Sequence, residues 1–450
     1  MEIIRMFLKI VFLSIDIFLL SMNVSFSQSF QDSNFEIASS FNPVGSGARA
    51  MGMGGAFMAV ADDATAASWN PAGLIQLLHP EASYVYSHIT RKEKNHFNTV
   101  NFSGIRYNNE FKNPSDETNT NFISVLYPIH LMRRNMIFSV STQCLYDFNR
   151  NWNFNINRSS FIDYWKYEQE GNLSALSFSY CIQAQSVKGL SIGATLNVWD
   201  DNITSNNWVQ NYHRNVVFNS GETAYQLIKR EEFVLKGINA NIGILWRVNE
   251  KVQLGAAFKT PFNADIRRQS FFYELNPETN ETNTNTNQFE ETLKMPMSYG
   301  IGVSYKFNNE LTISGDIYRT QWNHFEYIKN DQQAISAIQI AMDQSQIKPT
   351  HHLRLGMEYK LRYANMAIWS PVRAGLFYDP VVSQNNPDDM FGASVGFGIT
   401  KDERFSFDMA YQYRQGKNLF SHMVRSNAID FSQNIHEHLV YLSLIVYHDN

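Results

Sequence analysis

Three groups of residues in this chain have types and spacings that could do chemistry: a glycine cluster, a histidine pair and a set of basic residues. The glycine cluster is Gly52-Met53-Gly54-Gly55, a composition that could cradle a phosphate with backbone N–H groups. However, no G-x-x-x-x-G-K-[ST] sequence follows, and the cluster precedes no strand–helix unit. The sequence therefore argues against nucleotide binding.

The histidine pair and the serines raise the question of metal binding or catalysis. His436 and His438 would share one face of a strand, as a metal-binding pair does, but a place in an aromatic girdle or a loop is the favoured interpretation. No spacing of serine and histidine residues in the chain is typical of a catalytic triad. We therefore predict that the protein is not an enzyme and uses no metal or cofactor.

The basic residues occur in segments where apolar and polar side chains alternate, and each belongs to the polar set: Lys259, Lys306, Arg354 and Arg373. Period-two alternation predicts β-strands with one apolar face. The four basic side chains would then point to the polar face, where they could meet an acidic ligand. Neutralisation of Asp316, Glu358 or Asp408 is the favoured alternative, because buried charges must be paired.

The alternating segments are long and continue to the end of the chain. In 298–307 the apolar set is Tyr299, Ile301, Val303, Tyr305 and Phe307. Segments of about ten residues suit tilted membrane-spanning strands, whereas strands of soluble sandwiches average about five to six residues. Short turns and long connections also alternate, which is typical of outer-membrane barrels. The predicted fold class is all-β: a transmembrane antiparallel β-barrel of about 14 strands.

The long connections are expected near 148–170, 201–225, 261–294, 321–349 and 416–435. Residues 276–292 are Asn-rich and acidic and should need no packed structure. Residues 331–347 are rich in apolar residues without sustained alternation, which predicts a short helix. The sequence contains fifteen candidate strands, whereas bacterial single-chain barrels have an even number. We therefore expect 82–107 to hold one spanning strand and an external extension.

The bulk composition is compatible with an exported barrel. The 450 residues carry a net charge of −5, so no basic surface for nucleic acid is indicated. Mean hydropathy is −0.32, which a barrel can have because only alternate strand residues meet lipid. Aromatic residues make up 14%, which suits interfacial girdles. Residues 1–27 have the basic start, apolar stretch and small-residue end of a cleaved signal peptide.

The only two cysteines are not expected to form a disulfide. Cys144 should face outward, together with Tyr146, and Cys181 should face inward on its strand. Side chains on opposite faces cannot reach disulfide geometry.

Residues 28–80 differ from the strands and form the predicted plug. Small residues crowd its first half, Asp62-Asp63 can cap a helical turn, and Asn70-Pro71 would end that turn. From Ala48 to Leu74 the segment resembles the ARAxGMGGAxxAxADDAxAxxxNPAGL hatch of the FadL/TodX family of outer-membrane transporters. Segments 251–266, 295–326 and 352–380 resemble that family's barrel hairpins. The implied organisation is a signal peptide (1–27), a hatch (28–80) and a barrel (81–450).

The resemblance implies passive uptake of long-chain fatty acids or other hydrophobic compounds across the outer membrane of a Gram-negative bacterium, by a monomer surrounded by membrane lipid. Hatch movement would open the passage; a static plug is the alternative. The residues expected in gating or ligand binding are Gly54, Gly55, Phe57, Met58, Asn70, Pro71 and Ala72, with the four basic residues above.

A second function is compatible with the same motif. PorV-like proteins of the same broad family have a similar ARAxGMGGA hatch and receive secreted cargo in type IX secretion. The Ser27-Gln28 cleavage site and the Asn-rich loops would suit bacteria with that system. Trp322-x-x-Phe325 and the hairpin at 371–380 look closer to the transporter branch. We therefore predict transport, with a surface scaffold for secretion as the alternative.

Overall fold

The computed structural model describes residues 45–100, 106–131, 134–157, 161–276, 281–363, 368–401, 404–420 and 429–448. The expected signal peptide and residues 28–44 of the expected hatch lie outside the described residues. Short helices come first: α2 (Ala48–Gly52), α3 (Ala66–Trp69) and the 3-10 helix η2 (Pro71–Gln76). Among the described residues, no helix has the length and apolar character needed to cross a membrane.

Strands make up most of the rest of the described chain. They are β1 (Glu81–Val100), β2 (Arg106–Leu131), β3 (Arg134–Asp147), β4 (Arg150–Asn157), β5 (Phe161–Gln183), β6 (Leu190–Asp200), β7 (Asn206–Phe218), β8 (Thr223–Arg247), β9 (Val252–Lys259), β10 (Phe262–Asn276), β11 (Glu281–Met295), β12 (Ser298–Lys306), β13 (Leu311–Thr320), β14 (Glu326–Ile328), β15 (Ala334–Ile335), β16 (Thr350–Tyr363), β17 (Ile368–Tyr378), β18 (Met390–Lys401), β19 (Phe405–Leu419) and β20 (Ile429–Tyr447).

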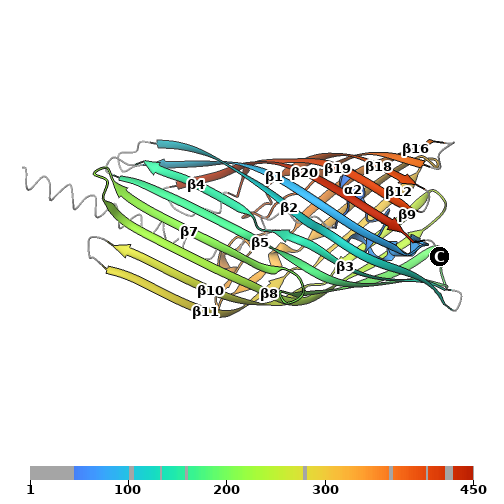
Figure 1. The fold of residues 1–450 in the computed structure, drawn as a ribbon, viewed down its shortest axis with the longest axis horizontal. Coiled ribbons are helices and arrows are strands. Elements are labelled where there is room, and N and C mark those ends of the chain that lie inside the picture. Colours follow the sequence, from blue (N-terminus) through green and yellow to red (C-terminus); the bar gives the residue numbers. More distant parts are fainter. Residues whose placement is uncertain are drawn as a thin grey trace, which may run out of the picture.

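Fourteen of these strands close into a ring by antiparallel pairing. Figure 1 shows the resulting barrel from the side. The order is β1–β2–β3–β5–β6–β8–β9–β12–β13–β16–β17–β18–β19–β20, and β20 pairs back with β1. Closure gives each of these fourteen strands a partner on both sides, which a lipid environment requires. The predicted barrel is confirmed, and so is its strand number. As expected, 82–107 contributes one spanning strand: the outer part of β1 pairs with the start of β2.

Within the ring, apolar side chains point outward and small or polar ones inward. Ile301, Leu376 and Val395 are 64%, 60% and 59% exposed when lipid is left out of account. Their strand neighbours Gly302 and Ser394 lie on the inner face, Ser394 being buried. This is the alternation that a barrel between lipid and a polar interior must have.

Several expected loops are wrong, because the wall continues as strands beyond the ring. The expected loops 148–170, 201–225 and 261–294 contain β4, the outer part of β5, β7, β10 and β11, which extend away from the ring (Figure 1). In these extensions many aromatic side chains point inward: Trp165 is buried, whereas its neighbour Lys166 is exposed. The apolar face has changed sides because water, not lipid, surrounds the extension.

The predicted helix in 331–347 is also wrong. This segment forms β15, which pairs with β14, and a single 3-10 turn, η4 (Met342–Gln344); another, η3 (Trp322–His324), precedes it. Ile335, Ala337 and Ile338 are buried in a cluster with Trp199 and Trp322. The apolar residues of the segment therefore serve tertiary packing, and no helical period is needed. The Asn-rich segment expected to lack packed structure is in part the strand β11, paired with β10.

One predicted orientation is corrected by a β-bulge. The ladder between β3 and β5 shifts register between Cys144 and Tyr146. The extra residue reverses the alternation, so Tyr146 faces the interior, where its ring stacks on Phe148. Both cysteines are free thiols.

Candidate functional site

Residues 45–77 fill the inner space of the ring. Helix α2 lies against β17, β18, β19 and β20, and η2 lies against β5, β6 and β8. The wall approaches this plug through glycines: a Cβ on any of them would come within 3.0 Å of a plug backbone or side-chain atom. They are Gly193, Gly243, Gly255, Gly356, Gly375 and Gly396. The plug therefore fits a recess that only the smallest residue can form.

Asn70 fixes the centre of the plug. Its side-chain N–H groups donate to the carbonyl of Met58 (2.9 Å) and to that of Ile244 in the barrel wall (3.0 Å), and its Oδ1 accepts from the N–H of Ala72 (3.2 Å). One amide side chain thus joins two plug segments and ties both to β8. Pro71 begins η2, where its missing N–H costs nothing.

Asp316 on β13 holds the next plug segment. Its Oδ2 accepts hydrogen bonds from the backbone N–H groups of Phe57 and Met58, both at 2.8 Å. Phe57 is fully buried and meets Trp69 edge to face, with ring centroids 6.1 Å apart. Both plug residues expected near the ligand therefore pack within the plug and against the wall, and neither lines the cavity described below.

Ion pairs connect the plug to the neighbouring strands of the wall. Arg49 of α2 binds Asp62 (2.7 Å) and Glu358 of β16 (2.9 Å). Arg373 bridges Glu358 (2.7 Å) and Asp408 (2.5 Å). Arg373 thus takes the neutralising role that the sequence favoured over ligand binding.

Arg354 links the plug to the residues above it. Its Nη1 donates to the carbonyl of Gly54 (3.1 Å) and its Nη2 to Asp379 (2.6 Å). Asp379 also contacts His352 Nδ1 at 2.9 Å. Gly54 and Gly55 both have positive φ, 66° and 75°, which lets the plug backbone turn beneath this arginine.

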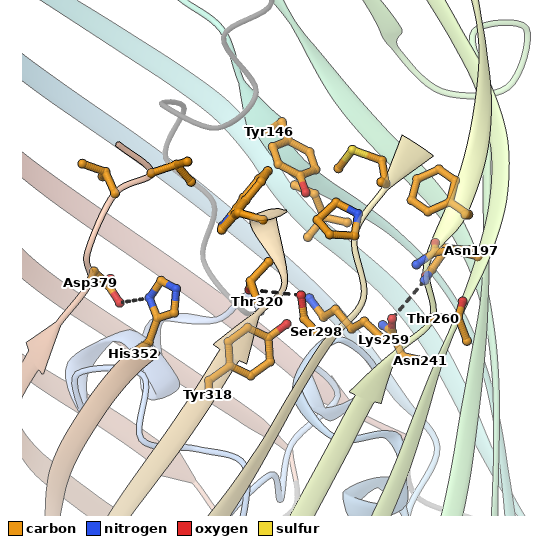
Figure 2. Close-up of a pocket in the computed structure, with 18 of the residues that line it drawn as sticks. Tyr146, Asn197, Asn241, Lys259, Thr260, Ser298, Tyr318, Thr320, His352 and Asp379 are labelled. Atoms are coloured by element: carbon orange, nitrogen blue, oxygen red, sulfur yellow. Dashed lines mark hydrogen bonds and ion pairs between the residues drawn. The ribbon is translucent and has the colours of Figure 1, made fainter. Parts of the chain in front are cut away.

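A cavity of about 100 Å³ lies in the lumen and includes Asp379 and His352 in its wall (Figure 2). One part of the lining is apolar or aromatic: Leu145, Tyr146, Trp199, Phe262, Met295, Trp322 and Val382. Another part is polar: Asn197, Asn241, Lys259, Ser298, Thr320, His352, Asp379 and Arg414. Tyr318 lines the cavity and also belongs to the core cluster of the plug, so cavity and plug adjoin.

Of the four predicted basic residues, the structure brings one to the cavity. Lys259, at the end of β9, lies among Asn241, Thr260 and Ser298 in Figure 2. Arg354 reaches the cavity only through Asp379, and Arg373 lies among its carboxylates against the plug. Lys306 is exposed at the other end of its strand, β12, next to a short turn. The four candidate basic residues therefore have different surroundings, and Lys259 is the one of them that lines the cavity.

The aromatic lining was missed by sequence reasoning. Trp199, Phe262 and Trp322 come from segments predicted to be strand ends or loops. Trp199 and Phe262 stack, with centroids 6.0 Å apart and an angle of 9° between the rings. One sequence pattern could have indicated it. Aromatic residues occur at alternate positions in the expected loops, as at Trp152 and Phe154 or at Trp165 and Tyr167, and this spacing indicates strands with one aromatic face.

The histidine pair lies on the outer face of β20. Nδ1 of His436 and of His438 each forms a 2.7 Å hydrogen bond with a tyrosine hydroxyl of β19, Tyr413 and Tyr411 respectively. This arrangement fits a place in the aromatic girdle at the membrane interface, the interpretation that the sequence favoured. Within the described ranges, no group of three or more His, Cys, Asp or Glu side chains is placed to hold a metal ion.

Comparison with known proteins places this geometry in context. A family model described as outer membrane protein transport protein (OMPP1/FadL/TodX) matches residues 27–436. Among solved structures, a FadL homologue of Pseudomonas aeruginosa is similar at 14% identity, covering 91% of this chain and 99% of that chain, with a TM-score of 0.65. The toluene transporter TodX of Pseudomonas putida is similar at 15% identity, covering 90% and 99%, with a TM-score of 0.56.

The monoaromatic hydrocarbon channel CymD is similar at 15% identity, covering 91% of this chain and 99% of that chain, with a TM-score of 0.55. At these identities the likeness to solved structures establishes the fold. No curated protein matches the chain in sequence.

Proposed function

Because the chain belongs to the OMPP1/FadL/TodX family of outer-membrane transport proteins, we propose that it takes up amphipathic hydrophobic compounds, long-chain fatty acids in particular, by passive passage across the outer membrane. The observation that carries the proposal is the two-sided cavity, aromatic on one side and polar around Lys259 on the other. A fatty acid has the same two parts, and a lysine ammonium pairs well with a carboxylate. Water exclusion by the aromatic side drives entry of the apolar part.

The cavity would hold the carboxylate and the first carbons of such a ligand. Its volume, about 100 Å³, is smaller than a long acyl chain needs. The aromatic cluster that contains Trp199, Trp208 and Phe233 continues from the cavity into the barrel extension. The remaining carbons would lie along these rings, whose side chains would have to move apart.

A single-ring hydrocarbon is the second candidate ligand. The solved structures include a toluene transporter and a monoaromatic hydrocarbon channel. The cavity volume also favours this candidate, because an engineered apolar cavity of about 150 Å³ is enough to bind benzene. A neutral ring would gain from the stacked Trp199 and Phe262 and would not need Lys259.

Replacing Lys259 distinguishes the two ligands. In a strain deleted for the gene, we expect Lys259→Met to lower uptake of radiolabelled oleate and to leave toluene uptake unchanged. Lys306→Met is the matched control, since this lysine lies away from the cavity, and it should leave both unchanged. Normal oleate uptake in Lys259→Met would contradict the fatty-acid proposal, and loss of toluene uptake alone would favour the hydrocarbon.

We further propose that the plug moves during passage. Arg354 supports this, because it joins the plug carbonyl of Gly54 to Asp379 in the cavity wall. Cys181 Sγ lies 3.3 Å from the carbonyl oxygen of Ala72, so Ala72→Cys in a Cys144→Ser background should crosslink the plug to β5. Oxidation should then lower uptake and reduction should restore it, whereas Ala72→Ser should respond to neither. Equal uptake before and after reduction would show that the plug is static.

The gene-deletion strain also tests the secretion alternative. Uptake of oleate and toluene and the display of secreted surface proteins can be measured in the same cells. Normal uptake combined with lost secretion would replace transport by a PorV-like role.

A further inference from the structure

The outer faces of β1, β2, β19 and β20 change from apolar to basic at one level of the barrel. In the lower part, Tyr84, Leu444 and Phe407 are neighbours across three strands and are exposed. Higher up, Lys92 faces His436 across the ladder from β1 to β20. Two residues further along β1, Lys94 faces Lys112 of β2. We call Lys92, Lys94, Lys112 and His436 the basic patch.

The basic patch lies where the outer leaflet ends. A tilted strand crosses the hydrocarbon layer in about 9–11 residues, and β1 begins at Glu81, so Lys92 comes at the end of the crossing. The tall extension and its long hairpins lie on the same side, which is the external side in outer-membrane barrels. The patch is therefore level with the headgroups of the outer leaflet.

Only one of the three lysines in the patch forms an ion pair with a residue that the structure describes. Like charges on directly opposed strand positions are destabilising, and Lys94 opposite Lys112 is such a pair. Lys94 contacts Glu110 at 2.8 Å, while Lys92 and Lys112 form no ion pair with any residue that the structure describes. Asp116, also on this face, accepts a hydrogen bond from Thr90 at 2.6 Å.

Outward-facing lysines on the other side of the barrel differ in this respect. Lys166 pairs with Glu168 at 2.8 Å, Lys236 with Asp200 at 2.8 Å, and Lys294 with Glu326 at 2.6 Å. These three lysines thus each have a carboxylate partner, whereas Lys92 of β1 and Lys112 of β2 have none among the described residues. His436 also faces this surface. Its Nδ1 is hydrogen-bonded to the Tyr413 hydroxyl, so a ligand would meet Nε2.

We propose that the basic patch binds the phosphate groups of an anionic glycolipid in the outer leaflet. Lysine ammonium groups bind phosphate as point charges, and clusters of them at a membrane surface attract anionic lipid. The apolar strand faces below would contact the acyl chains of the same lipid. Such a lipid would fix the height of the barrel in the membrane and lie beside the route by which ligands reach its mouth.

The test uses the full mature protein in an uncharged detergent. The variant is Lys92→Ala/Lys94→Ala/Lys112→Ala, and the matched control is Lys166→Ala/Lys236→Ala/Lys294→Ala. The probes are purified lipopolysaccharide and the same material after enzymatic removal of its phosphates, with binding measured on immobilised protein. Resistance of the barrel to unfolding in cold dodecyl sulfate shows that each variant is folded.

We expect the patch variant to bind intact lipopolysaccharide on the order of 100-fold more weakly than the wild type, since each lysine near an anionic surface contributes a factor of about five. The control should bind as the wild type does, and the dephosphorylated probe should bind the wild type as weakly as the variant binds the intact one. Equal binding by variant and wild type, or by the wild type to both probes, would overturn the proposal.

Discussion

At the scale of single residues, the plug is held by a few buried polar groups that each satisfy several partners. Asp316 accepts two backbone N–H groups, Asn70 connects three segments, and Arg354 joins plug and cavity wall. Buried polar groups cost about 1–3 kcal/mol when left without partners. The positions of these three side chains therefore determine where the plug sits.

Asp63 makes the stability of the plug depend on pH. Burial raises the pKa of its carboxyl to about 6, although Arg49 and hydrogen bonds from Thr65 oppose the shift. Because the folded pKa lies above the unfolded one, this group's stabilising contribution is complete below about pH 4 and is lost as the pH rises through about 6. We expect Asp63→Asn, which stays neutral, to be more stable than the wild type at pH 7 and equal to it at pH 4.

Thermal unfolding in detergent measures this difference. Asp331→Asn, in an exposed turn, serves as the control and should show no pH-dependent difference from the wild type. A constant difference between Asp63→Asn and the wild type across this pH range would contradict the assignment.

At the scale of elements, each long strand carries two patterns. Along β5, the inner positions hold serine and alanine within the ring and Trp165 and Tyr167 in the extension. The outer positions change in the opposite sense, from Phe178 to Lys166. The side chains follow the surroundings of the strand, which are lipid outside the ring and water outside the extension.

The glycines of the barrel wall that face the plug predict how a wall strand and the plug depend on each other. A Cβ at Gly375 of β17 would come within 3.0 Å of Gly54 N, whereas a Cβ at Gly315 of β13 would meet no atom closer than 3.6 Å. We therefore expect Gly375→Ala to leave the barrel folded but to displace the plug and raise single-channel conductance in planar bilayers. Gly315→Ala should have the wild-type conductance. Unchanged conductance in Gly375→Ala would mean that the wall can yield without moving the plug.

At the scale of the whole molecule, the barrel is surrounded by lipid at the level of the ring and by water at the level of the extension. The plug lies inside the ring. The same ring that exposes Ile301 to lipid places Gly302 beside the plug, within reach of Ala59. The cavity exists where the plug ends and the aromatic residues of the extension begin. Position along the barrel axis therefore separates lipid contact, gating and ligand contact.

The membrane as solvent gives a prediction for the whole molecule. Ile301 lies in the middle of β12 and is 64% exposed. We expect Ile301→Lys to lower the free energy of unfolding of the barrel by about 2–4 kcal/mol, because a charge would face hydrocarbon. Val209→Lys, on the outer face of β7 in the extension, should change stability by less than about 0.5 kcal/mol. Urea unfolding in lipid vesicles measures both. Similar values for the two variants would contradict the location of the membrane.

The sequence by itself determined the barrel, its strand number and the plug motif, because alternation and small-residue clustering are local properties that each segment shows without its neighbours. It also gave Lys259 as one of four candidate basic residues, but it could not show which of the four lines the cavity. Which residues line the cavity was decided only by the tertiary structure, since that lining combines residues of ten strands with segments between strands. The strands are β3, β6, β8, β9, β10, β11, β12, β13, β16 and β19.

Ring closure decides which strands face one another, and the plug decides where the space between them ends. The bulge beside Tyr146 and the reversed alternation of the extension likewise depend on contacts between strands and on the surrounding solvent. No single segment of the sequence contains that information.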